Sequence, residues 1–400
     1  MNREDFPIFQ EKKDLIYFDN GATTLKPKKV IDSIVEYYSS YTANAHRGDY
    51  DNSIEVDQKY ETVRQKVKNL INARDTKEII FTKGTTDSIN TIVFGYMRYY
   101  LKECDEVLLT KSEHASNILP WFELSKEIGI KIKFIDLDEN FSINSDNLLK
   151  AITNNTKVIS IAHVTNVIGD VRDVKMIGNI CKERNILFVV DAAQSIGHLS
   201  IDVEKYNIDF LGFSAHKMLG PTGIGVLYGK YKLLDKLIPV SYGGGMNSFF
   251  ESTGDIEYKE LPERLESGTP NIAGVIGLGE AIDYITEMGI QKIHNYELRL
   301  KEYAISKLEK IEDLKIYNRN TSSGIIVFNI DNIFSQDLAV YLNYYKVCIR
   351  SGNHCAKILK DELKTSNTCR LSLYLYNTKE EIDKLVEVLK NRENIYDIIL

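Results

Sequence analysis

The segment Phe210-Leu-Gly-Phe-Ser-Ala-His-Lys-Met-Leu-Gly-Pro-Thr-Gly-Ile-Gly-Val-Leu-Tyr228 is the most informative part of the sequence for the fold. It begins and ends with short apolar runs, and a polar loop with a lysine and several glycines lies between them. Apolar runs without polar alternation are typical of strands that are buried on both faces, as in parallel sheets. We therefore expect two core strands, Phe210–Phe213 and Gly225–Tyr228, separated by this loop.

Similar apolar runs precede this segment. We expect further strands at Glu78–Phe81, Glu106–Leu109, Lys131–Ile135, Val158–Ala162 and Leu187–Val190. Amphipathic stretches typical of helices lie between several of them, at Thr86–Tyr100, Ser116–Ile128 and Val174–Glu183. Such alternation of strands and helices predicts an α/β fold with a mostly parallel sheet and helices on both of its faces.

The pattern changes near residue 290. A long helix is expected at Gln291–Ile311, followed by strands at Gly324–Ile330, Val347–Arg350 and Arg370–Leu373 and by helices at Ser335–Tyr345 and Lys379–Lys390. This mixture predicts a smaller α+β domain. The first 60 residues are expected to form a strand, a helix and a polar loop. We assign residues 20–285 to a large domain, and residues 1–19 with 286–400 to a small one.

The composition excludes several classes of protein. The chain of 400 residues is 43% hydrophobic and 27% charged, which is ordinary globular usage and unlike a disordered chain, a collagen or a coiled coil. Its net charge of −7 argues against non-specific nucleic-acid binding. No apolar run is long enough for a membrane span or a signal peptide. Five cysteines form no disulfide framework, so we expect a cytoplasmic protein.

Lys217 and Asp191 are the first candidates for chemistry. Lys217 lies in the loop after an apolar strand, and a lysine amine in a low-dielectric cleft becomes a usable Schiff-base nucleophile. Asp191 ends another strand, at the edge where parallel sheets bind ligands. The pair matches pyridoxal phosphate sites, in which the acid contacts the pyridinium nitrogen. Taken alone, Lys217 would more often be a surface lysine and Asp191 a helix cap.

Three further positions follow strands. Gly84 leads into Thr85 and Thr86 at the start of a helix, where free N–H groups and hydroxyls form an anion site or an ordinary N-cap. His114 and Asn166 lie in loops just after strands. A single histidine is more often structural, although histidine is also the usual acid–base group near neutral pH.

The last candidates lie in the C-terminal part. Arg370 has the geometry to bind a carboxylate through two parallel hydrogen bonds. Cys355 lies in a polar loop beside His354, where a thiol is expected to be exposed and partly ionised. Cys348 and Cys369 fall within strand-like runs and are expected to be small buried hydrophobes. Because the cysteine spacing lacks any CxxC pair, we expect no metal site.

The order of these motifs resembles the fold-type I, class V aminotransferase group of pyridoxal phosphate enzymes. The resemblance is greatest to the SUF-type (group II) cysteine desulfurases and the related selenocysteine lyases. The matching stretches run almost from end to end: Tyr17-Phe-Asp-Asn-Gly-Ala-Thr-Thr24, Ala45-His-Arg-Gly48, Thr82-Lys-Gly-Thr-Thr86, Glu113-His114, His163-Val-Thr-Asn166, Asp191-Ala-Ala-Gln194, Ser214-Ala-His-Lys217, Gly220-Pro-Thr-Gly223, Glu266-Ser-Gly-Thr-Pro-Asn271, Arg350-Ser-Gly-Asn-His-Cys-Ala356 and Cys369-Arg370 through Tyr376-Asn-Thr378.

The resemblance implies a pyridoxal 5′-phosphate site in the large domain. Lys217 would hold the cofactor as a Schiff base and later move the Cα proton, Asp191 would pair with the pyridinium nitrogen, and Gln194 would hydrogen-bond the ring phenolate. His114 would stack on the ring and assist proton transfer. The phosphate would be held by Thr85, Thr86, Ser214 and His216, with Thr269 reaching in from the second subunit of a homodimer.

The resemblance also implies how the substrate L-cysteine is bound. Asn166, which is also a cofactor contact, and Arg370 would orient the substrate carboxylate, and Arg47 and Arg350 would lie near the substrate entrance. Cys355 would take the sulfur as a persulfide, leave alanine, and pass the sulfur to an acceptor protein for iron–sulfur cluster assembly.

Two departures from the family pattern and three alternatives accompany this interpretation. Asn353 stands where the family usually has a second histidine before the cysteine, and His114-Ala-Ser-Asn117 replaces the usual His-His-Ala-Asn.

The alternatives are a selenocysteine lyase, another class V aminotransferase or C–S lyase in which Cys355 is incidental, and a non-enzymatic dimeric scaffold that binds a sulfur acceptor.

Overall fold

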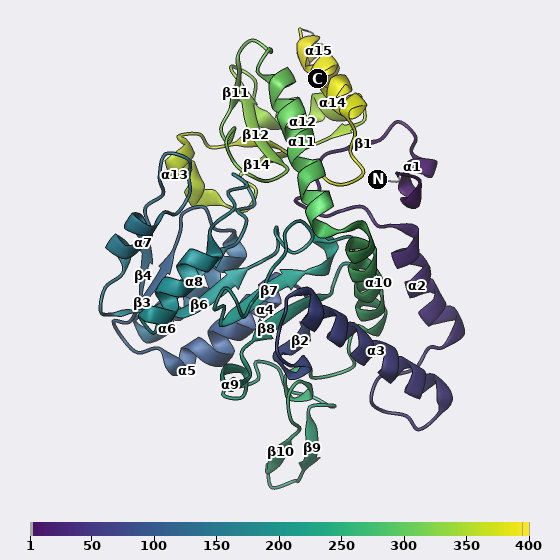
Figure 1. The fold of residues 1–400 in the computed structure, drawn as a ribbon, viewed down its shortest axis with the longest axis vertical. Helices are drawn as coiled ribbons and strands as arrows, with labels where there is room; N and C mark the ends of the chain where they lie inside the picture. Colours follow the sequence, from purple (N-terminus) through teal and green to yellow (C-terminus); the bar gives the residue numbers. More distant parts are fainter. Residues whose placement is uncertain (1–2, 394, 400) are drawn as a thin grey trace.

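A seven-stranded sheet forms the centre of the computed structural model, which describes residues 3–393 and 395–399 (Figure 1). Its strands are β2 (Ile79–Thr82), β3 (Glu106–Leu109), β4 (Lys131–Phe134), β5 (Thr156–Ala162), β6 (Leu187–Asp191), β7 (Phe210–Ser214) and β8 (Gly225–Gly229). The order across the sheet is β2-β8-β7-β6-β5-β3-β4. Strand β8 runs antiparallel to both of its neighbours, and the remaining pairs are parallel. The predicted α/β fold with a mostly parallel sheet is therefore confirmed.

Helices cover both faces of this sheet, because its central strands are apolar on both faces. On one face, Trp121 of α6 (Leu119–Ile128) packs with α4 (Thr85–Ile92) and with alternate strand residues. On the other face lie α2 (Lys28–Ser40), α3 (Asp51–Leu70), α8 (Val174–Glu183) and α10 (Ile272–Met288). Short helices α5 (Arg98–Tyr100), α7 (Ser145–Ala151) and α9 (Tyr231–Leu234) complete this part.

Two expectations for helices differ from the structure. Helix α3 occupies a region where a polar loop was expected; its buried residues Val56, Tyr60, Val63 and Val67 form a narrow stripe within an otherwise polar sequence, so the apolar signal is weak. The helix expected at Thr86–Tyr100 is interrupted by a π-helical turn at Val93–Met97.

The C-terminal part contains a four-stranded antiparallel sheet in the order β11-β12-β15-β14. Its strands are β11 (Leu314–Ile316), β12 (Ile325–Ile330), β14 (Arg350–Gly352) and β15 (Thr368–Ser372). Around it lie α11 (Ile290–Leu308), α12 (Ser335–Tyr344), α13 (Lys360–Leu363), α14 (Lys379–Lys390) and α15 (Ile395–Ile399). The sheet and several of these helices share one hydrophobic cluster. The division of the chain into residues 20–285 and the rest stays a prediction.

The strand expected at Val347–Arg350 is split in the structure. Strand β13 (Val347–Cys348) pairs in parallel with β1 (Ile16–Tyr17) near the N-terminus, whereas β14 pairs with β15. Beyond this pairing, the N-terminal segment contributes the short helix α1 (Ile8–Glu11). Strand β1 therefore lies beside β13, which precedes β14 and Cys355 in the sequence.

A hairpin projects away from the main body of the molecule (Figure 1). It consists of β9 (Asn247–Phe250) and β10 (Ile256–Tyr258), and Phe249, Phe250 and Ile256 are exposed on it. Within the described residues, no helix combines the length and apolar character that crossing a membrane requires.

Candidate active site

A cavity of about 220 Å³ opens at the carboxyl ends of the parallel strands. Asp191 ends β6, Ser214 ends β7 and Ala162 ends β5, so the strand order places all three at one edge. The cavity brings together the predicted residues Thr85, Thr86, His114, Asn166, Asp191, Gln194, Ser214, His216, Lys217, Arg350, Cys355 and Arg370. Residues that are far apart in the sequence thus form a single site.

Lys217 and Asp191 lie on the floor of this cavity and influence each other. Burial lowers the pKa of Lys217 to about 8, and the nearby Asp191 carboxylate opposes this shift. Burial raises the pKa of Asp191 to about 6. The hydrogen bond that its Oδ1 accepts from Ala193 N–H at 2.9 Å acts in the opposite direction and lowers this pKa. At pH 7 about a tenth of the lysine is therefore a neutral amine, the nucleophilic form, which is far more than at an unperturbed lysine.

The ring of His114 is held in one tautomer. Its Nδ1 accepts a hydrogen bond from the Ser116 backbone N–H at 3.1 Å. The neutral ring therefore carries its proton on Nε2. Burial lowers the pKa of His114 to about 4, and the positive charges of Lys217 and Arg350 act in the same direction. His114 is thus a neutral imidazole at physiological pH.

One end of the cavity is built to hold an anion. Gly84, with φ of 146°, is the N-cap of α4, and the first residues of this helix, Thr85 and Thr86, line the cavity. The Ser214 Oγ accepts from Thr85 N–H at 2.8 Å and lies 2.8 Å from the Thr85 Oγ1. A Cβ on Gly225 would lie 2.4 Å from the Cα of Gly84, so the close approach of these two chains requires glycine.

The opposite end contains buried polar groups whose hydrogen-bonding capacity is not filled. The Arg370 guanidinium donates to Asp19 Oδ1 at 2.9 Å and to Asn166 O at 2.8 Å, and the Asn166 amide donates to His354 O at 2.7 Å. Arg370 Nε and Asn166 Oδ1 are buried and have no partner among the described residues. Buried polar atoms are normally satisfied, so a polar ligand is expected here.

Cys355 lies at the wall of the cavity on a loop whose backbone is held in place. Its side chain is exposed, and the Arg350 Nη2 lies 3.7 Å from its Sγ. Its carbonyl accepts from Ala115 N–H at 2.8 Å. His354 is buried, and its Nε2 lies 3.0 Å from both oxygens of Thr368; burial lowers the pKa of this ring to about 3. His354 therefore anchors the loop, while the neighbouring thiol is free to react.

Arg47 and Thr269 do not line this cavity. Arg47 lies in a separate hollow with Gly245, Glu266 and Gly268, and the neighbouring Thr269 is exposed. Both side chains belong to the same surface region.

Sequence reasoning missed three supporting residues. Asp19 holds the Arg370 guanidinium, and the buried carboxylate of Glu113 pairs with Arg172 directly beside the His114 backbone. Asp19 lies within the motif Tyr17–Thr24 and Glu113 within the motif Glu113-His114, and membership of these motifs was the available signal. Their pairing with Arg370 and Arg172 produced none, because ion pairs between distant segments leave no local pattern. Within the described part of the chain, His, Cys, Asp and Glu side chains form no group that could hold a metal ion.

The family model "Aminotransferase class-V" matches residues 16–385 of this chain. The chain belongs to the class-V aminotransferase family. This finding confirms the family predicted from the motifs, whereas the group II assignment stays a prediction.

Curated members of this family resemble the chain over nearly its whole length. A "Probable cysteine desulfurase" of Halalkalibacterium halodurans is 40% identical over 394 residues, covering 98% of this chain and 97% of the relative. One of Borreliella burgdorferi is 44% identical over 400 residues, covering 97% and 94%.

Two solved structures have the same fold as this class-V chain. The apo structure of a cysteine desulfurase from Thermococcus onnurineus superposes with a TM-score of 0.93 at 37% identity, covering 97% of this chain and 96% of that one. The cysteine desulfurase CsdA from Escherichia coli, in an S-sulfonic acid form, gives a TM-score of 0.91 at 32% identity, covering 100% and 98%.

Proposed function

We propose that this protein is a pyridoxal phosphate-dependent cysteine desulfurase, which converts L-cysteine to L-alanine and keeps the sulfur as a persulfide on Cys355. The observation that carries this proposal is the shared cavity: Lys217 and Asp191 from the large sheet face the same space as the exposed Cys355 thiol from the C-terminal part. The similarity to cysteine desulfurases over almost the whole chain supports it.

The cavity fits pyridoxal phosphate at each of its parts. The anion cradle of Thr85, Thr86, Ser214 and His216 suits the phosphate, and the Asp191 carboxylate suits the ring nitrogen. Lys217 supplies the amine for the covalent link, and His114 supplies a flat, neutral ring. Gln194, whose amide donates to Gly21 O at 2.8 Å, lies close enough to the floor to contact the phenolate side. When bound, the cofactor withdraws electron density from the substrate Cα and returns it, which allows the Cβ–S bond to break.

The protein's own residues bind the substrate and move its protons. Arg370 and Asn166 bind the substrate carboxylate through the buried atoms that lack partners, and Asp19 keeps the guanidinium in place. The Lys217 amine takes the proton from the substrate Cα. Charge-assisted hydrogen bonds in a buried site give a fixed orientation.

Cys355 accepts the sulfur. Its Sγ, as a thiolate, attacks the substrate sulfur; an S–S bond forms as the Cβ–S bond breaks, and the bonding electron pair stays on the substrate carbon. A proton added to Cβ completes alanine, and His114, with its Nε2–H facing the cavity, assists this transfer. Arg350 keeps a positive charge beside the sulfur throughout.

The persulfide then has to reach another protein. Because the Cys355 side chain is exposed, a sulfur acceptor of SUF type can approach it directly, for iron–sulfur cluster assembly in the cytoplasm. All five cysteines are free thiols, which agrees with a reducing compartment. Persulfide transfer from the isolated protein to a candidate acceptor tests this step, and its absence with every SUF-type acceptor would contradict it.

We also propose a homodimer in which each subunit completes the site of the other. Arg47 and Thr269 share one surface region away from their own cavity, so a second copy can bring them to the phosphate and to the substrate entrance. The exposed apolar residues of the β9–β10 hairpin are available for burial in such a contact. Sedimentation equilibrium tests this proposal, and a monomer at micromolar concentration would contradict it.

One assay separates this function from its alternatives. The protein purified with pyridoxal phosphate should be yellow and should release one alanine per sulfur from L-cysteine. Keto acid and ammonia in place of alanine would indicate an aminotransferase or another C–S lyase, and a strong preference for selenocysteine would indicate a lyase of that type. A colourless protein with no turnover would contradict the proposal.

The proposed covalent link predicts a pH dependence for cofactor capture. The Lys217 pKa of about 8 lies below the usual 10.5, so the neutral amine is a minor form below pH 8 and the main form above it. The rate constant for capture of pyridoxal phosphate by the apoprotein should therefore rise about tenfold per pH unit below this pKa and level off above it. Stopped-flow absorbance of the visible band measures this rate, and a plateau reached only above pH 10 would show an unperturbed lysine.

A further inference from the structure

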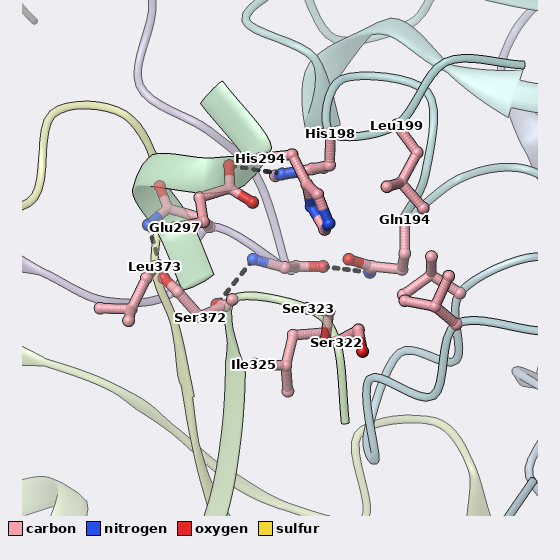
Figure 2. A pocket seen from close by; sticks show the side chains of 15 residues that line it. Gln194, His198, Leu199, His294, Glu297, Ser322, Ser323, Ile325, Ser372 and Leu373 are labelled. Carbon is pink, nitrogen blue, oxygen red and sulfur yellow. Dashed lines mark hydrogen bonds and ion pairs between the residues drawn. The ribbon is translucent and has the colours of Figure 1, made fainter. Parts of the chain in front are cut away.

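A second, small cavity of about 20 Å³ adjoins the active site. Figure 2 shows the side chains that line it. Gly21, Val164 and Gln194 line both cavities. The small cavity contains His198, His294 and Glu297, which the proposed reaction does not use. A cluster of titratable side chains in this position calls for a physical explanation.

Glu297 is the most deeply buried member of the cluster. Its side chain is 1% exposed and lies on α11, and its Oε1 is 2.8 Å from Nδ1 of His198 (Figure 2). Burying a carboxylate is costly unless it is paired. Burial raises the pKa of Glu297, and the neighbouring His198 opposes that shift. The other titratable groups that face the pair are His294 of α11 and the buried ring of Tyr374.

His198 closes the turn that begins with the cofactor-facing residues. This turn follows β6, whose last residue is Asp191, and carries Gln194 and then His198. Backbone hydrogen bonds hold it together, from Ile196 N–H to Ala192 O at 3.0 Å and from Leu199 N–H to Ser195 O at 2.8 Å. A displacement of its end at His198 is therefore transmitted to Gln194.

Tyr374 holds the same end of the turn from another side. Its ring centroid lies 4.5 Å from that of His198, and its hydroxyl donates to Gly197 O at 3.0 Å. Tyr374 follows β15, the strand that carries Arg370. The turn is thus joined by hydrogen bonds to α11, through Glu297, and to the segment after the substrate-binding strand, through Tyr374.

We propose that Glu297 is a positioning residue for the cofactor: through its hydrogen bond with His198, it fixes the turn that follows Asp191 and carries Gln194 beneath the ring. The inference rests on the proposed function, because it assumes that these two residues contact pyridoxal phosphate. Glu297 touches neither substrate nor cofactor. It connects α11, an element of the C-terminal part, to the floor of the cavity in the large sheet.

The test compares the purified variants Glu297→Gln and Glu297→Ala with the wild-type protein. Loss of the Glu297–His198 hydrogen bond should weaken pyridoxal phosphate binding about tenfold, as loss of an outer partner does at other ligand sites. It should also change the visible circular dichroism of the bound cofactor, which reports on its orientation. His198→Gln, at a less buried position, should reproduce both effects if α11 variants fold poorly.

The matched control is Glu106→Gln. Glu106 is also a buried carboxylate with a lysine partner, Lys133, but it lies at the start of β3, at the opposite end of the strands from the cavity. The proposal expects similar losses in the melting temperature of the apoprotein for Glu297→Gln and Glu106→Gln, with cofactor affinity and dichroism changed only in the former. Wild-type affinity and dichroism in the Glu297 and His198 variants, or equal changes in Glu106→Gln, would overturn it. A wild-type protein that binds no pyridoxal phosphate would instead refute the proposed function.

Discussion

Cys355→Ala is expected to bind pyridoxal phosphate as tightly as the wild-type protein and yet to lose alanine formation from L-cysteine by about 10³-fold or more. The exposed side chain contacts Arg350, and its charge is only the smallest of the effects on the pKa of Lys217. Its removal therefore leaves the yellow protein intact. What disappears is the sulfur nucleophile, for which the cavity contains no other cysteine among its lining residues.

The measurement is alanine release together with persulfide detection by mass spectrometry. Cys104→Ala is the matched control, because Cys104 is also an exposed thiol but lies near the start of β3, away from the cavity. The control should keep the wild-type rate. Wild-type turnover by Cys355→Ala would show that the nucleophile is assigned wrongly. Retained turnover on selenocysteine alone would favour the selenocysteine lyase alternative.

The sequence was sufficient to predict the large sheet, since its central strands β6 and β7 and the neighbouring β8 are mainly apolar runs. The expected strand Glu106–Leu109 and the expected helices Val174–Glu183 and Lys379–Lys390 coincide with β3, α8 and α14. In all of them, local pattern and tertiary burial agree. The split of Val347–Arg350 into β13 and β14 was not predictable, because it depends on pairing with the distant β1.

The residues of the candidate site, like the strands, could be predicted only where they follow a local sequence pattern. Lys217, Asp191 and Cys355 each follow a recognisable local pattern, and the structure brings them to one cavity. Asp19 and Glu297 act only through partners that are more than ninety residues away in the sequence, at Arg370 and His198. No local sequence pattern indicates that two such distant residues form a pair. Arg47 and Thr269 present a further difficulty, because the positions proposed for them require a second copy of the chain.

Lys217→Ala is expected to abolish turnover, with a loss of about 10⁴-fold or more, and to remove the visible band of the covalently bound cofactor. One side chain has two tasks in the proposed reaction: its amine forms the covalent link and later moves the substrate Cα proton. The substitution by alanine removes the amine and therefore prevents both tasks. Lys217→Arg should fail equally, although it keeps the positive charge, because a guanidinium stays protonated and is no nucleophile.

The control for this experiment is Lys301→Met. Lys301 is also buried, and burial lowers its pKa to about 7, but it donates to Thr321 outside the cavity. Its removal should lower stability while leaving the visible spectrum and the alanine rate per bound cofactor unchanged. If added amines restore part of the activity of Lys217→Ala but not of Lys217→Arg, the missing group is a base that needs space at that position. Alanine release by Lys217→Ala at the wild-type rate would contradict both tasks assigned to this lysine.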